Sequence, residues 1–136
     1  MGNGGSATNL AAGSITGQLS GVTFVTAAGS VTNAGTIVGT TANGVNLNAG
    51  GVVDNSGSIT GSLVGVRSLA GLTLTSSGSI SGGGNAVESV GAFNDTLTFL
   101  TGSTTTGSVL TDDGDDLISL AGGLTGSVGA GAGADT

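Results

Sequence analysis

The segment Gly35–Val66 reads GTIVGTTANGVNLNAGGVVDNSGSITGSLVGV and contains one phrase twice. The first copy, GTIVGTTANGV, begins at Gly35, and the second, GSITGSLVGV, begins at Gly57. The phrase also occurs before this segment as GSITGQLSGV from Gly13 and after it as GSISGGGNAV from Gly78. A phrase that recurs at a fixed period is typical of repeat proteins, in which each unit completes its core against the next. The period therefore decides the architecture.

Three columns of apolar residues share a period of about 21 residues. The first column, with steps of 22, 22 and 21, comprises Ile15, Ile37, Ile59 and Ile80. The second, with steps of 23, 21, 21, 22 and 19, comprises Val22, Val45, Val66, Val87, Val109 and Val128. The third, with steps of 22, 21, 23 and 21, comprises Val31, Val53, Leu74, Leu97 and Ile118.

Three columns with one period describe a coil that has three faces and one short strand on each face. Stacked coils pair each strand with its equivalent in the next coil, about 4.8 Å away. The sequence therefore predicts an all-β fold, a three-sided parallel β-solenoid of about six coils of 19–24 residues. At that spacing the rod is about 29 Å long. The columns alone leave its handedness open.

We expect residues 1–136 to form one domain, a fragment of a longer array. Residues 1–12 are expected to form an irregular first coil, 13–88 the regular repeats, and 89–136 repeats with acidic turns. The first coil differs because SATNLAAGSITG, from Ser6, resembles SVTNAGTIVG, from Ser30, with two residues inserted. A terminal coil has only one neighbour, so an atypical sequence is expected there.

The composition excludes several classes of protein. The 30 glycines could indicate a disordered linker, but 37% of the residues are hydrophobic and fall in register. The net charge is −7, with a single basic residue, which argues against binding to nucleic acid or to anionic membrane surfaces. No run of 18 apolar residues occurs, so we expect no membrane insertion by this segment.

Two asparagines, Asn33 and Asn55, follow the third column by two positions. Strand alternation turns them to the same side as the column, toward the interior or a corner. Their amides could stack and bond to each other and to the corner backbone along the rod. Alternatively, each could be a plain turn residue that tolerates the left-handed conformation. The sequence does not decide between these two interpretations.

Aspartates recur in the last third of the chain at Asp95, Asp116 and Asp135, with spacings of 21 and 19. We expect them to stack at one corner. Carboxylates one coil apart repel each other unless they are protonated, hydrated or bridged by a cation.

One acidic turn resembles half of a calcium-binding repeat. Gly114–Ile118 fits the pattern G-x-D-x-U, in which U is a large apolar residue. That motif binds calcium when it recurs every nine residues, whereas here it recurs once per coil. A structural acidic turn is therefore the preferred interpretation, and the residues that could approach a calcium site are Asp112, Asp113, Asp115 and Asp116.

The sequence offers little for catalysis. It contains no His, Cys, Lys or Tyr, which excludes Ser-His-Asp, Cys-His and Schiff-base chemistry. Paired carboxylates exist only in the acidic turn, where solvation or cation binding is the more common role. We predict that the protein is not an enzyme and needs no cofactor, apart from the calcium that the acidic turn could hold.

The run from Gly29 to Val66, with the NDTLTF and GDDLISL segments after it, resembles the passenger region of bacterial autotransporters and related surface adhesins. The resemblance covers nearly the whole chain and rests on the xVxNxGxI phrase. It implies a right-handed parallel β-helix that is exported through the outer membrane and displayed at the cell surface. It implies no particular activity or host ligand. The family's C-terminal membrane barrel carries aromatic girdles, and three Phe are the only aromatic residues here, so we expect only the stalk.

Three functional hypotheses follow. The first is a structural stalk that displays another part of a surface or secreted protein. The second is a self-assembling filament or adhesion module whose exposed strand edges stack end to end. The third is a solenoid that binds a glycan or ice. Ice binding needs threonines at fixed places in every coil, and no unbroken register is evident for Thr23, Thr73, Thr75, Thr96 and Thr98.

The only basic residue, Arg67, provides a test of the register. Arg67 and Glu88 each follow a valine of the second column, 21 residues apart. Because those valines point inward, the residues after them point outward on the same face. We predict an ion pair between neighbouring coils, flanked by Asn46 on one side and Leu110 on the other.

Overall fold

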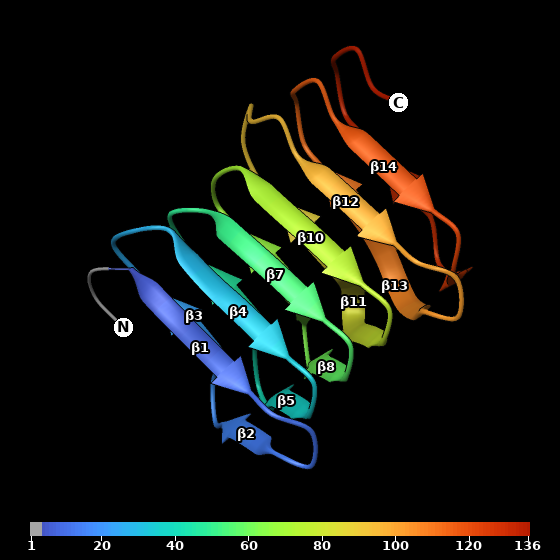
Figure 1. Cartoon of the computed structure of the whole chain (residues 1–136). Coiled ribbons are helices and arrows are strands. Elements are labelled where there is room, and N and C mark those ends of the chain that lie inside the picture. Colours follow the sequence, from blue (N-terminus) through green and yellow to red (C-terminus); the bar gives the residue numbers. More distant parts are fainter. Residues whose placement is uncertain (1–3) are drawn as a thin grey trace.

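The computed structural model describes residues 4–136, and every regular element within them is a β-strand. The chain winds as a stack of coils, with its two ends at opposite ends of the stack (Figure 1). One face of the stack is a six-stranded parallel sheet. Its strands, in order, are β1 (Gly5–Asn9), β4 (Gly29–Asn33), β7 (Gly51–Asn55), β10 (Leu72–Ser76), β12 (Thr96–Phe99) and β14 (Leu117–Leu120).

The other two faces belong to one continuous sheet, because two strands span both. These are β11 (Ser79–Ser89), whose register shifts between Ser81 and Val87, and β13 (Thr104–Thr111). The second face comprises β2 (Ser14–Gly17), β5 (Thr36–Gly39), β8 (Ser58–Gly61), the first halves of β11 and β13, and β15 (Gly123–Thr125). The third comprises β3 (Val22–Phe24), β6 (Asn43–Leu47), β9 (Val64–Ser68), the second halves of β11 and β13, and β16 (Val128–Gly129).

Strands of equivalent position pair in parallel from coil to coil, which confirms the predicted β-solenoid of about six turns. All three apolar columns are confirmed residue by residue. Ile37 lies beside Ile59, Val45 beside Val66, and Val53 beside Leu74. Beyond Ile80, the first column continues through Thr105 and Leu124.

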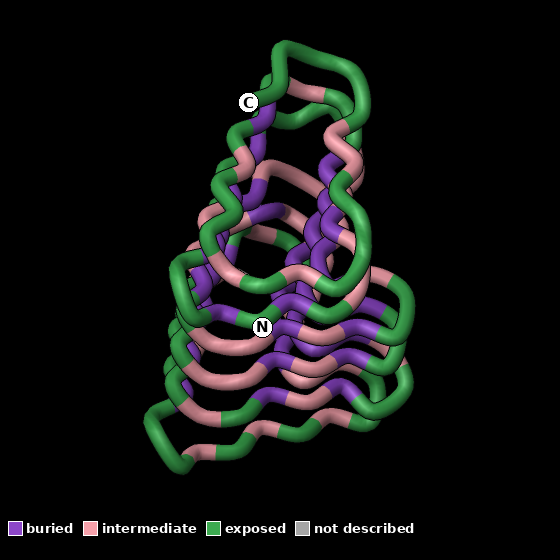
Figure 2. The backbone as a smooth tube through the Cα atoms, turned by 90° about the vertical axis from the view of Figure 1, so that its right-hand side faces the viewer, coloured by how far each residue is buried: buried purple, intermediate pink, exposed green. Residues whose placement is uncertain are grey.

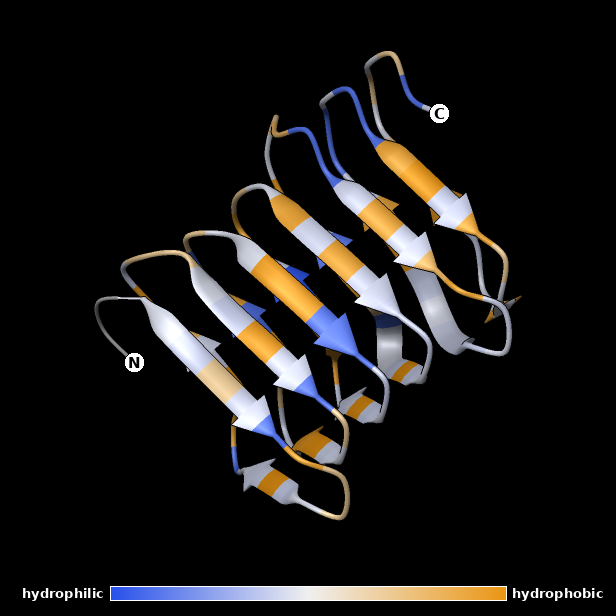
Figure 3. Ribbon diagram, viewed as in Figure 1, coloured by the Kyte–Doolittle hydropathy of each residue, from blue (hydrophilic) through white to orange (hydrophobic). Residues whose placement is uncertain are grey.

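The apolar columns form the core. Two central members of each column are fully buried: Ile37, Ile59, Val45, Val66, Val53 and Leu74. Apolar bands at the centres of the first-face strands align along the stack (Figure 3). Buried positions concentrate in the middle coils (Figure 2), because Ile15 and Ile118 at the two ends have a neighbour on one side only and are partly buried.

Glycine is required where the chain turns back close to itself at the end of each second-face strand. A Cβ atom added to Gly39 would lie 1.8 Å from the carbonyl oxygen of Asn43, and one added to Gly61 would lie 1.8 Å from that of Val64. No side chain fits such a gap, so the corner accounts for the glycine that recurs in the repeated phrase.

The described part of the first coil is more regular than predicted, and its insertion lies in one turn. Of the segment predicted to be irregular, residues 1–3 lie outside the described residues. Strand β1 pairs in full register with β4. The two inserted residues lie between β1 and β2, where Ala12 has a φ of 67° and the N–H of Gly13 donates to the carbonyl of Leu10.

Among residues 4–136 the structure shows no helix long and apolar enough to cross a membrane.

Candidate functional site

A ladder of amides stabilises the corner after the first face. Asn9, Asn33 and Asn55 end successive strands, and all three are buried. Asn9 Nδ2 donates to Asn33 Oδ1 and Asn33 Nδ2 donates to Asn55 Oδ1, each over 2.8 Å. Asn55 Nδ2 then donates to Ser76 Oγ over 3.2 Å. The stacked-amide interpretation is therefore correct.

The same amides hold the backbone of the corner. Asn33 Nδ2 lies 3.2 Å from the carbonyl oxygen of Gly35 and 3.1 Å from that of Ser58 in the next coil. One side chain thus joins two coils at this corner and adds to the backbone bonds that cross it, such as the one from Ser58 N–H to the carbonyl of Gly35. After Ser76 the column becomes apolar, with Phe99 fully buried and Leu120 exposed at the last coil.

A second ladder, of carboxylates, runs through the acidic coils at the start of the first-face strands. Leu72 N–H donates to Asp95 Oδ1 over 2.7 Å, and Asp95 N–H donates to Asp116 Oδ1 over 2.8 Å. Asp116 N–H donates to Asp135 Oδ1 over 3.1 Å. The predicted stack of aspartates is confirmed. Each carboxylate accepts a backbone bond from the coil before it, which partly offsets the repulsion between neighbours.

Burial makes this ladder unusual. Asp95 and Asp116 are each 2% exposed. Burial raises the pKa of Asp95 above 3.8, and the charge of Asp116 adds to this; the N–H of Leu72 and the nearby Ser89 hydroxyl oppose it. Ser89 Oγ is close enough to act on Asp95, but makes no hydrogen bond of standard geometry among the described residues.

The four candidate calcium ligands of the acidic turn each use one oxygen to bind a neighbouring coil. Asp116 does so within the buried ladder. The other three are exposed and accept backbone bonds of 3.0–3.2 Å: Asp112 from Gly91, Asp113 from Ala132 and Asp115 from Ala134. Within residues 4–136, no three or more His, Cys, Asp or Glu side chains are grouped to hold a metal ion. Calcium binding at the turn stays a prediction.

The predicted ion pair is present on the third face. Arg67 Nε lies 2.9 Å from Glu88 Oε2, and Asn85 Nδ2 donates to Glu88 Oε1 over 3.0 Å. Asn46 pairs with Arg67 from the coil before, and Leu110 pairs with Glu88 from the coil after, as predicted. The arrangement orders the surface of this face but leaves both charged groups partly exposed.

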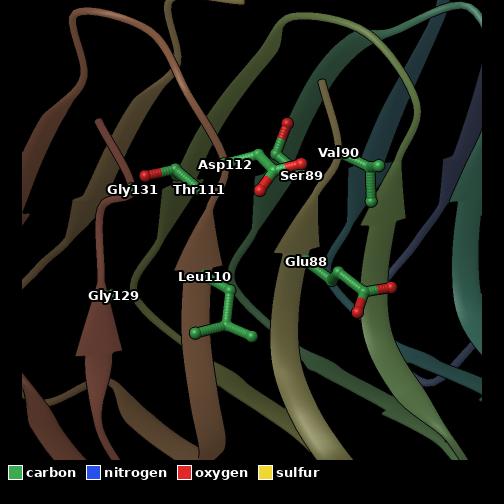
Figure 4. Close-up of a pocket in the computed structure, with 8 residues that line it drawn as sticks. All are labelled: Glu88, Ser89, Val90, Leu110, Thr111, Asp112, Gly129 and Gly131. Atoms are coloured by element: carbon green, nitrogen blue, oxygen red, sulfur yellow. The ribbon is translucent and has the colours of Figure 1, made fainter. Parts of the chain in front are cut away.

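A hollow of about 340 Å³ follows this ion pair along the same face. The hollow forms because Gly129 has no side chain at the position that Glu88 and Leu110 occupy in the preceding coils. Figure 4 shows the lining residues, which include Glu88, Leu110, Asp112 and the strand-end residues Ser89 and Thr111. The sequence carried one signal of it: the last valine step is 19 residues, so the last coil is shortened.

The second face presents hydroxyl groups in rows that run from coil to coil, here called ranks, which the sequence analysis did not predict. Its outward positions carry neither charged nor aromatic residues. The first rank is Ser14, Thr36, Ser58, Ser79 and Thr104 and ends at Gly123; the second is Thr16, Thr60, Ser81, Thr106 and Thr125 and is interrupted once, by Val38. On the first face, Thr73 pairs with Thr96 and Thr75 with Thr98, but Val52 and Asp54 interrupt the ranks there.

The chain matches no protein-family model, no curated protein and no solved structure. The fold and its two ladders define the class of this protein, which is a parallel β-solenoid repeat protein.

Proposed function

We propose that this solenoid is a structural stalk, a non-catalytic spacer in a surface-displayed or secreted bacterial protein of the autotransporter-passenger type. The observation that supports the proposal most is the unbroken register of the coils. The first face pairs without interruption from β1 to β14. Internal ladders of asparagine and aspartate tie neighbouring coils together at the corners. Such a rod holds its two ends at a fixed separation.

Rigidity is the first property to test. The chain has no Cys, so spin labels can be placed cleanly at Thr16→Cys and Thr125→Cys. These exposed positions belong to one rank and lie five coils apart, about 24 Å along the axis. Pulsed electron resonance should give one narrow distance distribution near that value, broadened only by the label tethers. A distribution as broad as that of a flexible linker of equal length would contradict a stalk.

Surface display is the second property to test. In cells that produce the parent protein, antibody against this segment should label intact cells, and external protease should remove the label. Labelling only after lysis would contradict the proposal. Electron microscopy of the purified chain separates the stalk from the self-assembling alternative: a stalk gives short discrete rods, whereas end-to-end stacking gives long uniform fibres.

The hydroxyl ranks of the second face favour one other role, the binding of a glycan surface or ice. An array that repeats along the strand and across the coils suits a ligand that is itself periodic in two directions. Thr60→Lys, at the centre of this face, should abolish co-sedimentation with insoluble polysaccharide or incorporation into growing ice. Thr75→Lys, on the first face, should leave either activity unchanged. If the wild-type chain shows neither activity, the ranks serve only to solvate the sheet.

A further inference from the structure

At the corner between the third and the first face, two interior columns of residues change together from apolar to polar along the stack. One column ends the third-face strands and the other begins the first-face strands. In the early coils this space is apolar, and a Cβ atom added to Gly29 would lie 2.3 Å from the ring of Phe24. Along the stack the first column runs Phe24, Leu47, Ser68, Ser89 and Thr111, while the second runs Gly29, Gly51, Leu72, Asp95 and Asp116.

The change leaves four buried oxygen atoms without a hydrogen bond of standard geometry among the described residues. Two are carboxylate oxygens, Asp95 Oδ2 and Asp116 Oδ2, and two are hydroxyls, Ser89 Oγ and Thr111 Oγ1. All four residues are 2% exposed. By contrast, Ser68, one coil earlier, donates to the carbonyl oxygen of Ala70 over 2.6 Å. Polar atoms are rarely left unpaired in an interior, because losing water without replacement is costly.

We propose that these four oxygens bind one divalent cation of the calcium class between the two coils. Two carboxylates and two hydroxyls form a set of hard oxygen ligands, which such cations prefer. The two carboxylates supply the charge that a divalent ion neutralises, and water completes the coordination shell.

The coil spacing favours calcium over magnesium. Equivalent oxygens of neighbouring coils lie about 4.8 Å apart, so an ion that bridges the two carboxylates cannot lie closer than about 2.4 Å to both. Calcium contacts of about 2.3–2.6 Å allow such a bridge, whereas the roughly 2.0–2.1 Å that magnesium requires is too short.

Two further observations agree with a cation at this place. The pKa of Asp95 is raised, chiefly by burial, so the bare carboxylate is poorly solvated and a bound cation would compensate it. Ser89 and Thr111 are also among the residues that line the surface hollow of Figure 4. This site is distinct from the exposed side chains of the acidic turn, and shares with them only Asp116.

The test is the effect of metal ions on thermal unfolding. Chain stripped with EDTA should be folded at neutral pH, and saturating calcium chloride should raise its Tm by at least about 5 °C. Magnesium chloride at the same concentration should have much less effect. Calorimetric titration should show one calcium per chain. No calcium-dependent shift, or an equal response to magnesium, would overturn the proposal.

Variants locate the ion. Asp95→Asn and Asp116→Asn keep the Oδ1 acceptor of the backbone ladder, so each should fold and lose the calcium response. Asp113→Asn and Asp115→Asn change only exposed carboxylates and should keep it. A response lost in these two controls and kept in the buried variants would move the site to the exposed turn and refute the buried one. If acidification stabilises the metal-free chain and calcium adds nothing to that stability, a proton occupies the place assigned to the ion, and the proposal is refuted.

Discussion

Arg67 and Glu88, 21 residues apart in the sequence, are direct partners in the pairing of β9 with β11, and Arg67 Nε donates to Glu88 Oε2 over 2.9 Å. Their side chains are 35% and 26% exposed. Solvent and salt screen such a pair, so its contribution to stability is small even though its geometry is good. The pair serves mainly to mark the register, because a slip of one residue would turn one partner into the interior.

A double-mutant cycle should measure this pair. We expect Arg67→Gln, Glu88→Gln and the double variant to give a coupling energy of about 0–1 kcal/mol in urea unfolding at low salt. The coupling should shrink toward zero in about 1 M sodium chloride, where the Debye length is near 3 Å. A coupling that is large and insensitive to salt would show that the pair is less solvated than its exposure indicates.

The core columns predict a larger effect. Ile59 is fully buried between Ile37 and Ile80, so Ile59→Ala should leave a cavity and lower the free energy of unfolding by about 2–5 kcal/mol. Leu63→Ala is a matched control, because Leu63 is 58% exposed; it should change stability by no more than about 0.5 kcal/mol. Equal denaturation midpoints for the two variants would contradict the column assignment.

The amide ladder can be tested in the same way. Asn33 donates to Asn55 and to two backbone carbonyls, and it accepts from Asn9, so Asn33→Ala leaves several buried groups without partners. We expect a loss of about 1–3 kcal/mol in denaturant unfolding. Asn94→Ala, at an exposed turn where the side chain accepts one bond from the N–H of Asp115, is the control and should cost much less. A small effect at Asn33 would mean that water replaces the ladder.

The sequence predicted the register because large apolar residues are informative. Ile and Val are costly to expose, so their spacing alone placed Val66 beside Val87 and hence Arg67 beside Glu88. Asparagine is different, because it suits both a turn and a buried ladder, so Asn33 stayed ambiguous until its partner atoms were placed. Serine and threonine carry even less information. Thr60 faces solvent while Thr111 is buried, and no local pattern separates them. For this reason, the hydroxyl ranks and the buried oxygens beside Asp95 could not be predicted.

The raised pKa of Asp95 predicts how stability depends on pH. Its pKa lies above 3.8 in the folded chain, so the folded state binds this proton more tightly than the unfolded state does. The corresponding stabilisation is fully present below the unfolded pKa and is lost as the pH rises through the folded pKa. In the presence of EDTA, the midpoint of denaturant unfolding should therefore fall between about pH 4 and pH 7 more steeply in the wild type than in Asp95→Asn.

The comparison with Asp95→Asn is needed because other carboxylates titrate in the same interval. Asparagine keeps an oxygen for the N–H of Leu72 and carries no charge, so the variant should be more stable than the stripped wild type at pH 7. Identical pH profiles for the two proteins would show that the Asp95 carboxylate is not destabilised by burial.

The repeat itself makes the last prediction. Deletion of residues 37–58 removes 22 residues, one complete coil, and joins Thr36 to Ile59. Because Thr36 is the partner of Ser58 and Ile37 is the partner of Ile59, the junction recreates a native second-face strand, with Thr36 in the place of Ser58. Asn33 would then occupy the place of Asn55 and donate to Ser76, so the amide ladder would lose one member but stay continuous. The shortened chain should keep its β-sheet circular dichroism and unfold cooperatively, since each coil contacts only its neighbours.

Deletion of residues 37–47 is the control, because removing half a period puts every later column out of register with the first coil. We expect that variant to be unfolded or aggregated, and a native-like spectrum from it would show that the columns do not determine the fold.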